Sequence, residues 1–180
     1  MKQKITEAIE IPEGISCKCE NKAVVCKKNS LELKKTFNLP KISINVKDNK
    51  IILECKKGNK NDYKQIQTMR AHITNLFNGF EKKFVYNLEA CNVHFPMTFK
   101  VEGDKLIIQN FLGEKLPRYA IISPSVEVEV KGQKIIVSSP DKEAAGQTAA
   151  NFEKATKIKG RDRRIFQDGI FITEKPEESK

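Results

Sequence analysis

The residues best suited to chemistry form a basic segment near the end of the chain. Between positions 154 and 164 it holds six cations and a single acid, Asp162. Ammonium and guanidinium groups bind phosphate, and the planar guanidinium can do so through two parallel hydrogen bonds. The segment therefore predicts a phosphate-binding surface, against the alternative of a solvated charged face. Its cations are Lys154, Lys157, Lys159, Arg161, Arg163 and Arg164.

Two features of the neighbouring sequence favour phosphate binding. Gly160 is expected to end or bend the helix that carries the first cations, which leaves the arginines on an exposed strand or loop. Apolar residues then follow at Ile165, Phe166 and positions 170–172. An apolar stretch that anchors a basic one predicts a surface that is ordered before it binds.

The sequence offers no group of residues that predicts catalysis. Its two histidines, His72 and His94, lie apart from any recognisable nucleophile motif. Gly113 stands without the repeated glycines of a nucleotide-binding loop. Asp162 and Asp168 are isolated carboxylates among arginines, for which local ion pairing is the simpler interpretation. We therefore expect a protein that is not an enzyme and that holds no cofactor.

The cysteines and the composition indicate a protein of a reducing compartment. The five cysteines are an odd number and are expected to be unpaired thiols. Cys17 and Cys19 share the parity of an expected strand, so buried small hydrophobes are favoured over zinc ligands. No apolar run is long enough for a membrane span, and the N-terminus lacks a signal-peptide core. We expect a cytoplasmic protein with no membrane partner, whose net charge of +10 attracts polyanions.

Internal similarity at a spacing of 84 residues predicts a duplicated fold. Pro12 and Pro96 are separated by that distance, as are Pro40 and Pro124. In each half, two alternating apolar segments flank a short polar turn, which is typical of an antiparallel hairpin. The matching segments are 42–47 with 126–131 and 50–53 with 134–137.

One amphipathic helix is expected after each hairpin. Asn61 or Asp62 is expected to cap the first helix, and Ser139 the second, with Pro140 at its first position. The expected stripes comprise Ile66, Met69, Arg70, Ile73, Leu76 and Phe77 in the first helix, with one Arg among the apolar residues, and Ala145, Thr148, Ala149, Phe152 and Ala155 in the second.

These elements predict an α+β fold of two tandem duplicated domains, each an antiparallel sheet packed with one helix. The first domain is expected to span residues 1–82. The second is expected to span residues 83–180, with the basic segment and a short acidic tail. An earlier pair of strands opens each domain, at residues 11–19 and 22–27 and again at residues 95–102 and 105–110.

Several long motifs follow one another along the second half of the chain. They are His94-Phe-Pro-Met, Asn110-Phe-Leu-Gly-Glu-Lys, Pro117-Arg118, Gly146-Gln-Thr-Ala-Ala-Asn151 and the run from Arg161 to Ile172. In this order they resemble the large-subunit ribosomal protein L6 family of the archaeal and eukaryotic type. The resemblance covers nearly the whole chain and is strongest over residues 94–173. The usual Gly-Pro-Lys-Gly turn of that family is replaced here by Cys26-Lys27-Lys28-Asn29-Ser30.

The resemblance implies a structural constituent of the large ribosomal subunit, in the cytoplasm, without catalytic residues or cofactors. Its C-terminal domain would be the main rRNA-binding part, near the sarcin–ricin loop and the stalk base. The implied partners are large-subunit rRNA and neighbouring ribosomal proteins, with translational GTPases close by. RNA contact is thereby expected at all six cations of the basic segment, and also at Lys115 and Arg118.

Two other functional classes remain as alternatives. An RNA-modifying enzyme on a similar scaffold would need a cluster of acids, bases or metal ligands, which the sequence does not show. A free-standing RNA-binding module would display exposed aromatic residues on its sheet for base stacking. This chain has no Trp, and its Phe and Tyr residues fall mostly at positions expected in the core.

Overall fold

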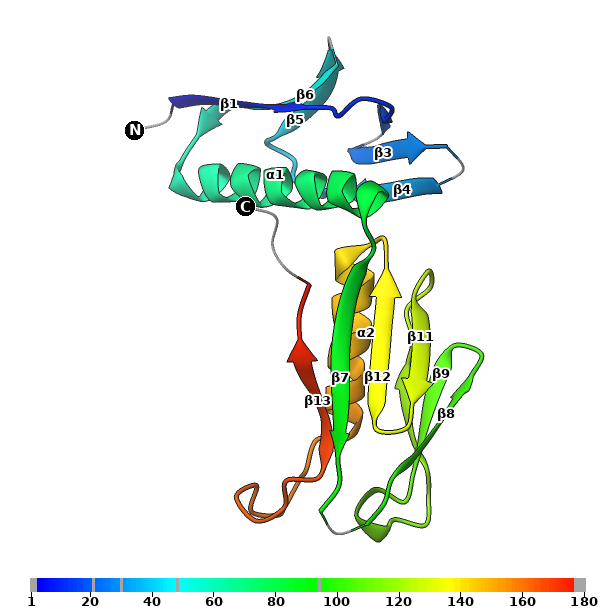
Figure 1. The fold of residues 1–180 in the computed structure, drawn as a ribbon. Helices are drawn as coiled ribbons and strands as arrows, with labels where there is room; N and C mark the ends of the chain where they lie inside the picture. The colour runs from blue at the N-terminus through cyan, green and yellow to red at the C-terminus, as the bar shows by residue number, and fades with distance from the viewer. Residues whose placement is uncertain (1–2, 21, 30, 48, 94, 177–180) are drawn as a thin grey trace. The chain divides into compact units, whose positions relative to one another are not determined.

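The computed structural model describes residues 3–20, 22–29, 31–47, 49–93 and 95–176. The chain divides into two compact units, Met1–Lys82 and Lys83–Lys180. Each unit contains antiparallel strands and one long α-helix (Figure 1). The predicted α+β class is confirmed.

The first unit holds two three-stranded antiparallel sheets and the helix α1. The strand orders are β1-β6-β5 and β2-β3-β4. Helix α1 packs against β6, β1 and β3 and closes the core. The elements are β1 (Gln3–Glu10), β2 (Ser16–Glu20), β3 (Ala23–Lys28), β4 (Leu31–Thr36), β5 (Ser43–Lys47), β6 (Lys50–Gly58) and α1 (Lys60–Glu81).

The second unit repeats this plan and adds one strand. Its sheets have the orders β11-β12-β7-β13 and β10-β9-β8. Helix α2 lies behind β7 and β12 in Figure 1 and also contacts β10 and β13. The elements are β7 (Phe84–Cys91), β8 (Thr98–Glu102), β9 (Lys105–Gln109), η1 (Phe111–Gly113), β10 (Arg118–Ile121), β11 (Glu127–Lys131), β12 (Lys134–Ser139), α2 (Lys142–Ala155) and β13 (Gly169–Glu174).

Corresponding sheets have the same strand order in both units, so the expected duplication is confirmed. The spacing between the repeats varies along the chain. The hairpins closed by Lys47–Lys50 and Lys131–Lys134 lie 84 residues apart. The hairpins closed by Glu20–Ala23 and Glu102–Lys105 lie 82 residues apart. Loops absorb these differences in length, because a shift of register inside a sheet would turn buried side chains outward.

Each unit has its own apolar core. In the first unit, Ile51 and Leu53 of β6 pack with Ile66 and Ile73 of α1. In the second unit, strand residues such as Ile135 and Leu88 pack with helix residues such as Phe152. The predicted helix stripes are therefore buried, except that Arg70 is exposed and Ala155 is only partly covered.

The helix starts differ from the predicted caps. Asn59, and not Asn61 or Asp62, caps α1, and Asp62 completes a capping box by accepting a hydrogen bond from the Asn59 N–H at 2.8 Å. Asp141 caps α2 in place of Ser139. The Ser139 hydroxyl is buried and instead accepts from the Asp141 N–H at 3.1 Å. Several polar residues at each helix start can act as caps, so composition alone could not choose among them.

Two strands begin the units where the sequence pattern predicted none. β1 pairs with β6, and β7 pairs with both β12 and β13. β7 begins directly after the domain boundary that was expected between residues 82 and 83. The turn after β3 keeps a left-handed residue, because Asn29 has a φ of 52°, a conformation that Asn tolerates better than most residues.

The thiols occupy varied environments. Cys26 and Cys55 are buried, Cys17 and Cys19 are partly buried, and Cys91 is exposed. Cys17 and Cys26 face each other across β2 and β3. A hydrogen bond from Cys26 lowers the pKa of the Cys17 thiol, and the same contact raises the pKa of Cys26.

Helix α2 supplies hydrogen-bond partners to β13. Thr156, the C-cap residue directly after α2, accepts a hydrogen bond from the Ile170 N–H at 2.9 Å. Glu153 accepts from the Ile172 N–H at 3.0 Å. The unpaired edge of a strand exposes N–H and C=O groups that need partners. Side chains of the helix therefore complete this edge of the four-stranded sheet.

The same helix also completes the edge at β10. Asn151 donates a hydrogen bond to the Ile121 carbonyl at 3.0 Å. Thr148, which is fully buried, accepts from the Ser123 N–H at 3.0 Å, just beyond the strand. Helix α2 thus binds strands of both sheets of its unit.

We expect Thr156→Val to destabilise the second unit by about 1–3 kcal/mol, because the buried Ile170 N–H loses its acceptor. Amide hydrogen exchange at Ile170 should accelerate accordingly. The control is Thr68→Val, which removes an exposed hydroxyl bonded to the Lys64 carbonyl on α1, and it should change stability by less than about 0.5 kcal/mol. Unchanged exchange at Ile170 would contradict the assigned role of Thr156.

Candidate nucleic-acid interface

Three loops of the second unit are tied together at the end that carries the basic segment. The Asp168 carboxylate is buried and accepts a hydrogen bond from the Val93 N–H at 2.8 Å. The Asn110 amide donates to the Pro96 carbonyl at 3.0 Å. These contacts connect the loop after β7 with the loop after β9 and with the segment before β13. The sequence predicted local ion pairing for Asp168, and the structure adds this hydrogen bond to a backbone N–H.

The loop after β9 has an unusual backbone. Asn110 and Leu112 have φ values of 59° and 50°, and Gly113 has a φ of 76°. The left-handed region is costly for Leu and more accessible to Asn and Gly. Such conformations persist where surrounding contacts fix them, and they occur often at binding sites. Here the buried Phe111 holds the turn to the core.

Arg118 fixes the end of this loop. Its guanidinium makes two hydrogen bonds to Glu114, at 2.7 and 2.6 Å, and a third to the Ala155 carbonyl at 2.8 Å. It also lies 4.2 Å from the centre of the Phe111 ring. Arg118 was predicted to contact RNA, and the structure engages most of its donors inside the protein. Its first role is to join the loop to the C-terminal end of α2.

The basic segment begins inside α2 and continues as an exposed loop. Lys154 lies in the last turn of the helix, which ends at Ala155. The helix therefore stops before Gly160, where the sequence suggested its end. Gly160 has a φ of 69°, so it bends the following loop. Beyond the helix, Lys157, Lys159, Arg161, Arg163 and Arg164 are all exposed.

Two arginines of this loop are held by internal contacts. The Arg161 guanidinium lies 4.8 Å from the centre of the Phe166 ring. Arg164 forms an ion pair with Asp162 at 2.8 Å, which is the local pairing that the sequence predicted for Asp162. This contact lowers the pKa of Asp162. Arg164 also remains largely open to solvent. Preorganised guanidinium groups lose less conformational entropy when they bind phosphate.

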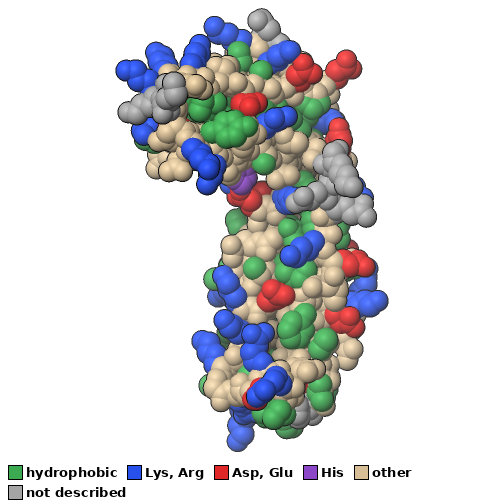
Figure 2. Space-filling view, turned by 90° about the vertical axis from the view of Figure 1, so that its left-hand side faces the viewer, with side chains coloured by type: hydrophobic (Ala, Val, Ile, Leu, Met, Phe, Trp, Pro, Cys, Tyr) green, Lys and Arg blue, Asp and Glu red, His purple; other side chains and the backbone are tan. Residues whose placement is uncertain are grey.

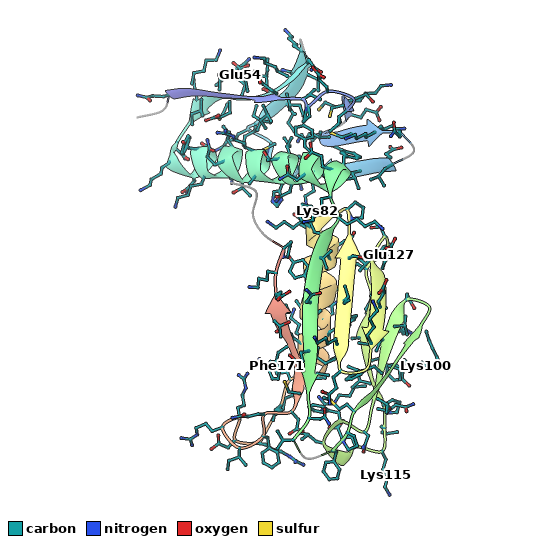
Figure 3. The ribbon with its side chains drawn as sticks, viewed as in Figure 1. Glu54, Lys82, Lys100, Lys115, Glu127 and Phe171 are labelled. Atoms are coloured by element: carbon teal, nitrogen blue, oxygen red, sulfur yellow. The ribbon has the colours of Figure 1, made fainter. Side chains whose placement is uncertain are left out.

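Two arginines lower the pKa of Glu114, which lies in the loop after β9. The hydrogen bond from Arg118 is the main cause of the lowered pKa of Glu114, and the charge of Arg161 lowers it further. Lys115, the next residue, is exposed and extends from the lower end of the unit in Figure 3.

The predicted RNA-contact residues thus gather around one end of the second unit. Lys and Arg side chains follow one side of this unit and continue to the end that carries the loops (Figure 2). Among the described residues, no hydrogen bond or ion pair engages the side chains of Lys115, Lys154, Lys157, Lys159 and Arg163. Their charges are available to a ligand.

Sequence reasoning missed the exposed apolar residues of this end. Ile165 was expected to anchor the basic segment, but most of its surface is exposed, and Leu116 is 81% exposed. Ile170, which was also expected to anchor the segment, is buried, and the buried Asp168 is an anchor that was not predicted. The apolar character of Ile165 and Leu116 did not indicate whether they are buried or exposed, because both lie in loops without periodicity.

The described residues bring together no metal or acid–base cluster. No group of three or more His, Cys, Asp or Glu side chains there could hold a metal ion. His72 packs beside Phe37, with ring centres 6.2 Å apart, and His94 lies outside the described residues. Within the described parts of the chain, neither helix is long and apolar enough to cross a bilayer.

Comparison with known proteins agrees with this arrangement. The sequence profile described as "Ribosomal protein L6" matches residues 95–169, which include the three loops and α2. "Large ribosomal subunit protein uL6" of Methanococcus vannielii is 45% identical over 171 residues, which cover 95% of this chain and 94% of the relative.

This chain belongs to the ribosomal protein L6 family. A protein with the same description from Methanobrevibacter smithii is 43% identical over 95% of this chain and 96% of the relative. One from Methanosphaera stadtmanae is 44% identical over 97% of this chain and 95% of the relative. Members of the L6 family are structural ribosomal components and not enzymes. The expectation of a non-enzymatic protein agrees with that membership.

We expect Glu114→Gln to destabilise the second unit at neutral pH, because the variant loses the ion pair with Arg118. The pKa of Glu114 is lowered in the folded state, so the ion pair stabilises the protein above the unfolded pKa of about 4.5. That contribution is lost as the pH falls through the lower folded-state pKa. Thermal unfolding of wild type and variant should therefore differ at pH 7 and converge near pH 3.

The control for this experiment is Asp104→Asn, which removes an exposed carboxylate from the turn between β8 and β9. Asn suits that turn as well as Asp does. Its unfolding midpoint should track the wild type across the whole pH range. A Glu114→Gln difference that does not shrink at low pH would show that the ion pair is not its cause.

Proposed function

We propose that the chain is a structural constituent of the large ribosomal subunit that binds rRNA through the loop end of its second unit. The single observation that carries this proposal is the guanidinium of Arg118, which binds Glu114 of the loop after β9 and the Ala155 carbonyl at the end of α2, where the basic loop leaves the helix. Membership of the ribosomal protein L6 family supports the ribosomal role. The cytoplasm is the proposed location, within the ribosome.

The chemistry of this end suits the phosphate backbone of folded RNA. Exposed cations supply charge that is independent of base sequence, which is the main source of affinity in many protein–nucleic acid complexes. Arg163 and Lys159 are exposed and available for direct phosphate contact. Arg161 and Arg164 are already oriented by Phe166 and Asp162. The proposed contacts are Lys154, Lys157, Lys159, Arg161, Arg163, Arg164 and Lys115, with Arg118 mainly in a positioning role.

The location within the subunit is a finer proposal. We place the loop end of the second unit at the sarcin–ricin loop and the stalk base, where it supports the region at which translational GTPases dock. The resemblance of motifs between residues 94 and 173 to the L6 family supports this location. Neighbouring ribosomal proteins complete the set of proposed partners. A free-standing RNA-binding module is the alternative, and it is less favoured because the relatives match this chain over nearly its full length.

Replacing Arg161, Arg163 and Arg164 with Ala together should weaken binding to large-subunit rRNA and flatten its salt dependence. Each lost phosphate contact lowers the slope of log affinity against log salt by roughly 0.7 to 0.9, so the triple variant should lose about 2 to 3 units of slope. The fold should survive, because the three side chains are exposed. Filter binding over a range of salt concentrations measures the effect.

The matched control replaces Lys56, Lys57 and Lys60 with Ala, which removes the same charge from exposed positions of the first unit. Attraction by net charge alone would make the two triple variants alike. Equal slopes and affinities at matched salt would therefore remove the basic segment as the binding site. Hydroxyl-radical footprints of reconstituted subunits test the location, and protection outside both the sarcin–ricin loop and the stalk base would refute it.

A further inference from the structure

The open face of the sheet β10-β9-β8 is a feature that the basic loops do not explain. Tyr119 and Ile121 of β10 are 58% and 62% exposed. Strand pairing sets the residues of this face in rows that cross the three strands. One row contains Tyr119, Ile107 and Lys100. The next row contains Ile121, Lys105 and Glu102. Residues directly opposite across a sheet share a face. An exposed aromatic ring and two isoleucines therefore lie on one surface with two lysines.

The duplicated fold supplies a comparison for this surface within the same chain. In the sheet β2-β3-β4, the row that corresponds to Tyr119, Ile107 and Lys100 is Lys34, Val25 and Lys18. In this row, the first strand has a Lys in both units and the second strand has an aliphatic residue in both. On the third strand, Lys34 of the first unit corresponds to Tyr119 of the second. In the next row of the same strand, Thr36 corresponds to Ile121. The second unit has thus placed an aromatic and an aliphatic side chain where the first unit has polar ones.

We propose that this face binds unpaired nucleotides of rRNA, with a base stacked on the ring of Tyr119. An aromatic ring on an open sheet is a usual platform for an unstacked base, and every base presents a suitable flat face. This inference rests on the proposed rRNA-binding role and extends it from the phosphate-binding loops to a second, base-binding surface.

Charge favours RNA over an apolar or basic protein partner. Lys105 forms no ion pair with any described residue, and Lys100 is paired with Glu102 at 2.6 Å while most of its side chain stays exposed. Lys100 points outward from β8 at the edge of this sheet (Figure 3). Because neighbouring strands are about 4.8 Å apart, Lys100 lies roughly 10 Å across the sheet from Tyr119. The flanking lysines can therefore hold phosphates while the ring holds a base.

The face is also continuous with the proposed interface. Strand β10 begins at Arg118, the residue that fixes the loop after β9. Lys115 and Leu116 are exposed just before it. An RNA segment on the loops can therefore extend onto β10.

The test compares variants of Tyr119 in the full chain for affinity to large-subunit rRNA. Tyr119→Ala and Tyr119→Leu should each lose roughly 5- to 100-fold in affinity, the range that one stacked base provides. Tyr119→Phe keeps the ring and should bind within about twofold of the wild type. The salt slope should stay unchanged in all three, because no charge is removed.

The matched control is Tyr63→Ala, which removes another exposed tyrosine, on α1 of the first unit. Equal affinities of Tyr119→Ala and Tyr63→Ala would overturn this inference while leaving the wild-type binding, and with it the proposed function, intact. Wild-type affinity of Tyr119→Leu would show a merely apolar contact and would also overturn it. Normal RNA affinity of Tyr119→Ala, combined with its loss from sedimenting subunits, would assign the face to a protein partner instead.

Discussion

The second unit depends on the hydrogen bonds that α2 makes with two separate sheets. Side chains of one helix satisfy backbone groups of β13 on one side and of β10 and its following residues on the other. A buried backbone group without a partner would cost about as much as a lost hydrogen bond. The loops that carry the basic residues begin or end at these same strands. Their positions are therefore set by the helix and not by the loops themselves.

The candidate interface inherits its order from this arrangement. Arg118 connects the first residue of β10 to the last carbonyl of α2, and its pairing with Glu114 orients the adjoining loop. The basic loop leaves the same end of the helix at Thr156 and returns to the sheet at Gly169. Both loops are thus held at their bases, and their cations remain outside. Charge alone attracts RNA, whereas this anchoring gives the charges a fixed pattern.

The sequence predicted the hairpins, the helix stripes and the duplication, because these leave periodic signals. Val128 and Val130 alternate with glutamates, and Ile66, Met69 and Ile73 follow a helical spacing. β1 and β7 were missed because their partners lie far along the chain and periodicity reports only local contacts. For the site, the basic segment was evident from composition. The engagement of Arg118, the exposure of Tyr119 and Ile165, and the backbone role of Asp168 depend on tertiary contacts, which no local pattern records.

The link between the second and third strands of each open sheet differs greatly between the repeats. β3 ends at Lys28 and β4 begins at Leu31, whereas β9 ends at Gln109 and β10 begins at Arg118. The strand pairings on either side are nevertheless equivalent. A duplicated gene product can thus keep one copy as a plain scaffold while the other accepts an insertion at the same joint. The architecture therefore allows this joint to differ in length between the two copies while the sheet beneath it keeps the same strand pairing.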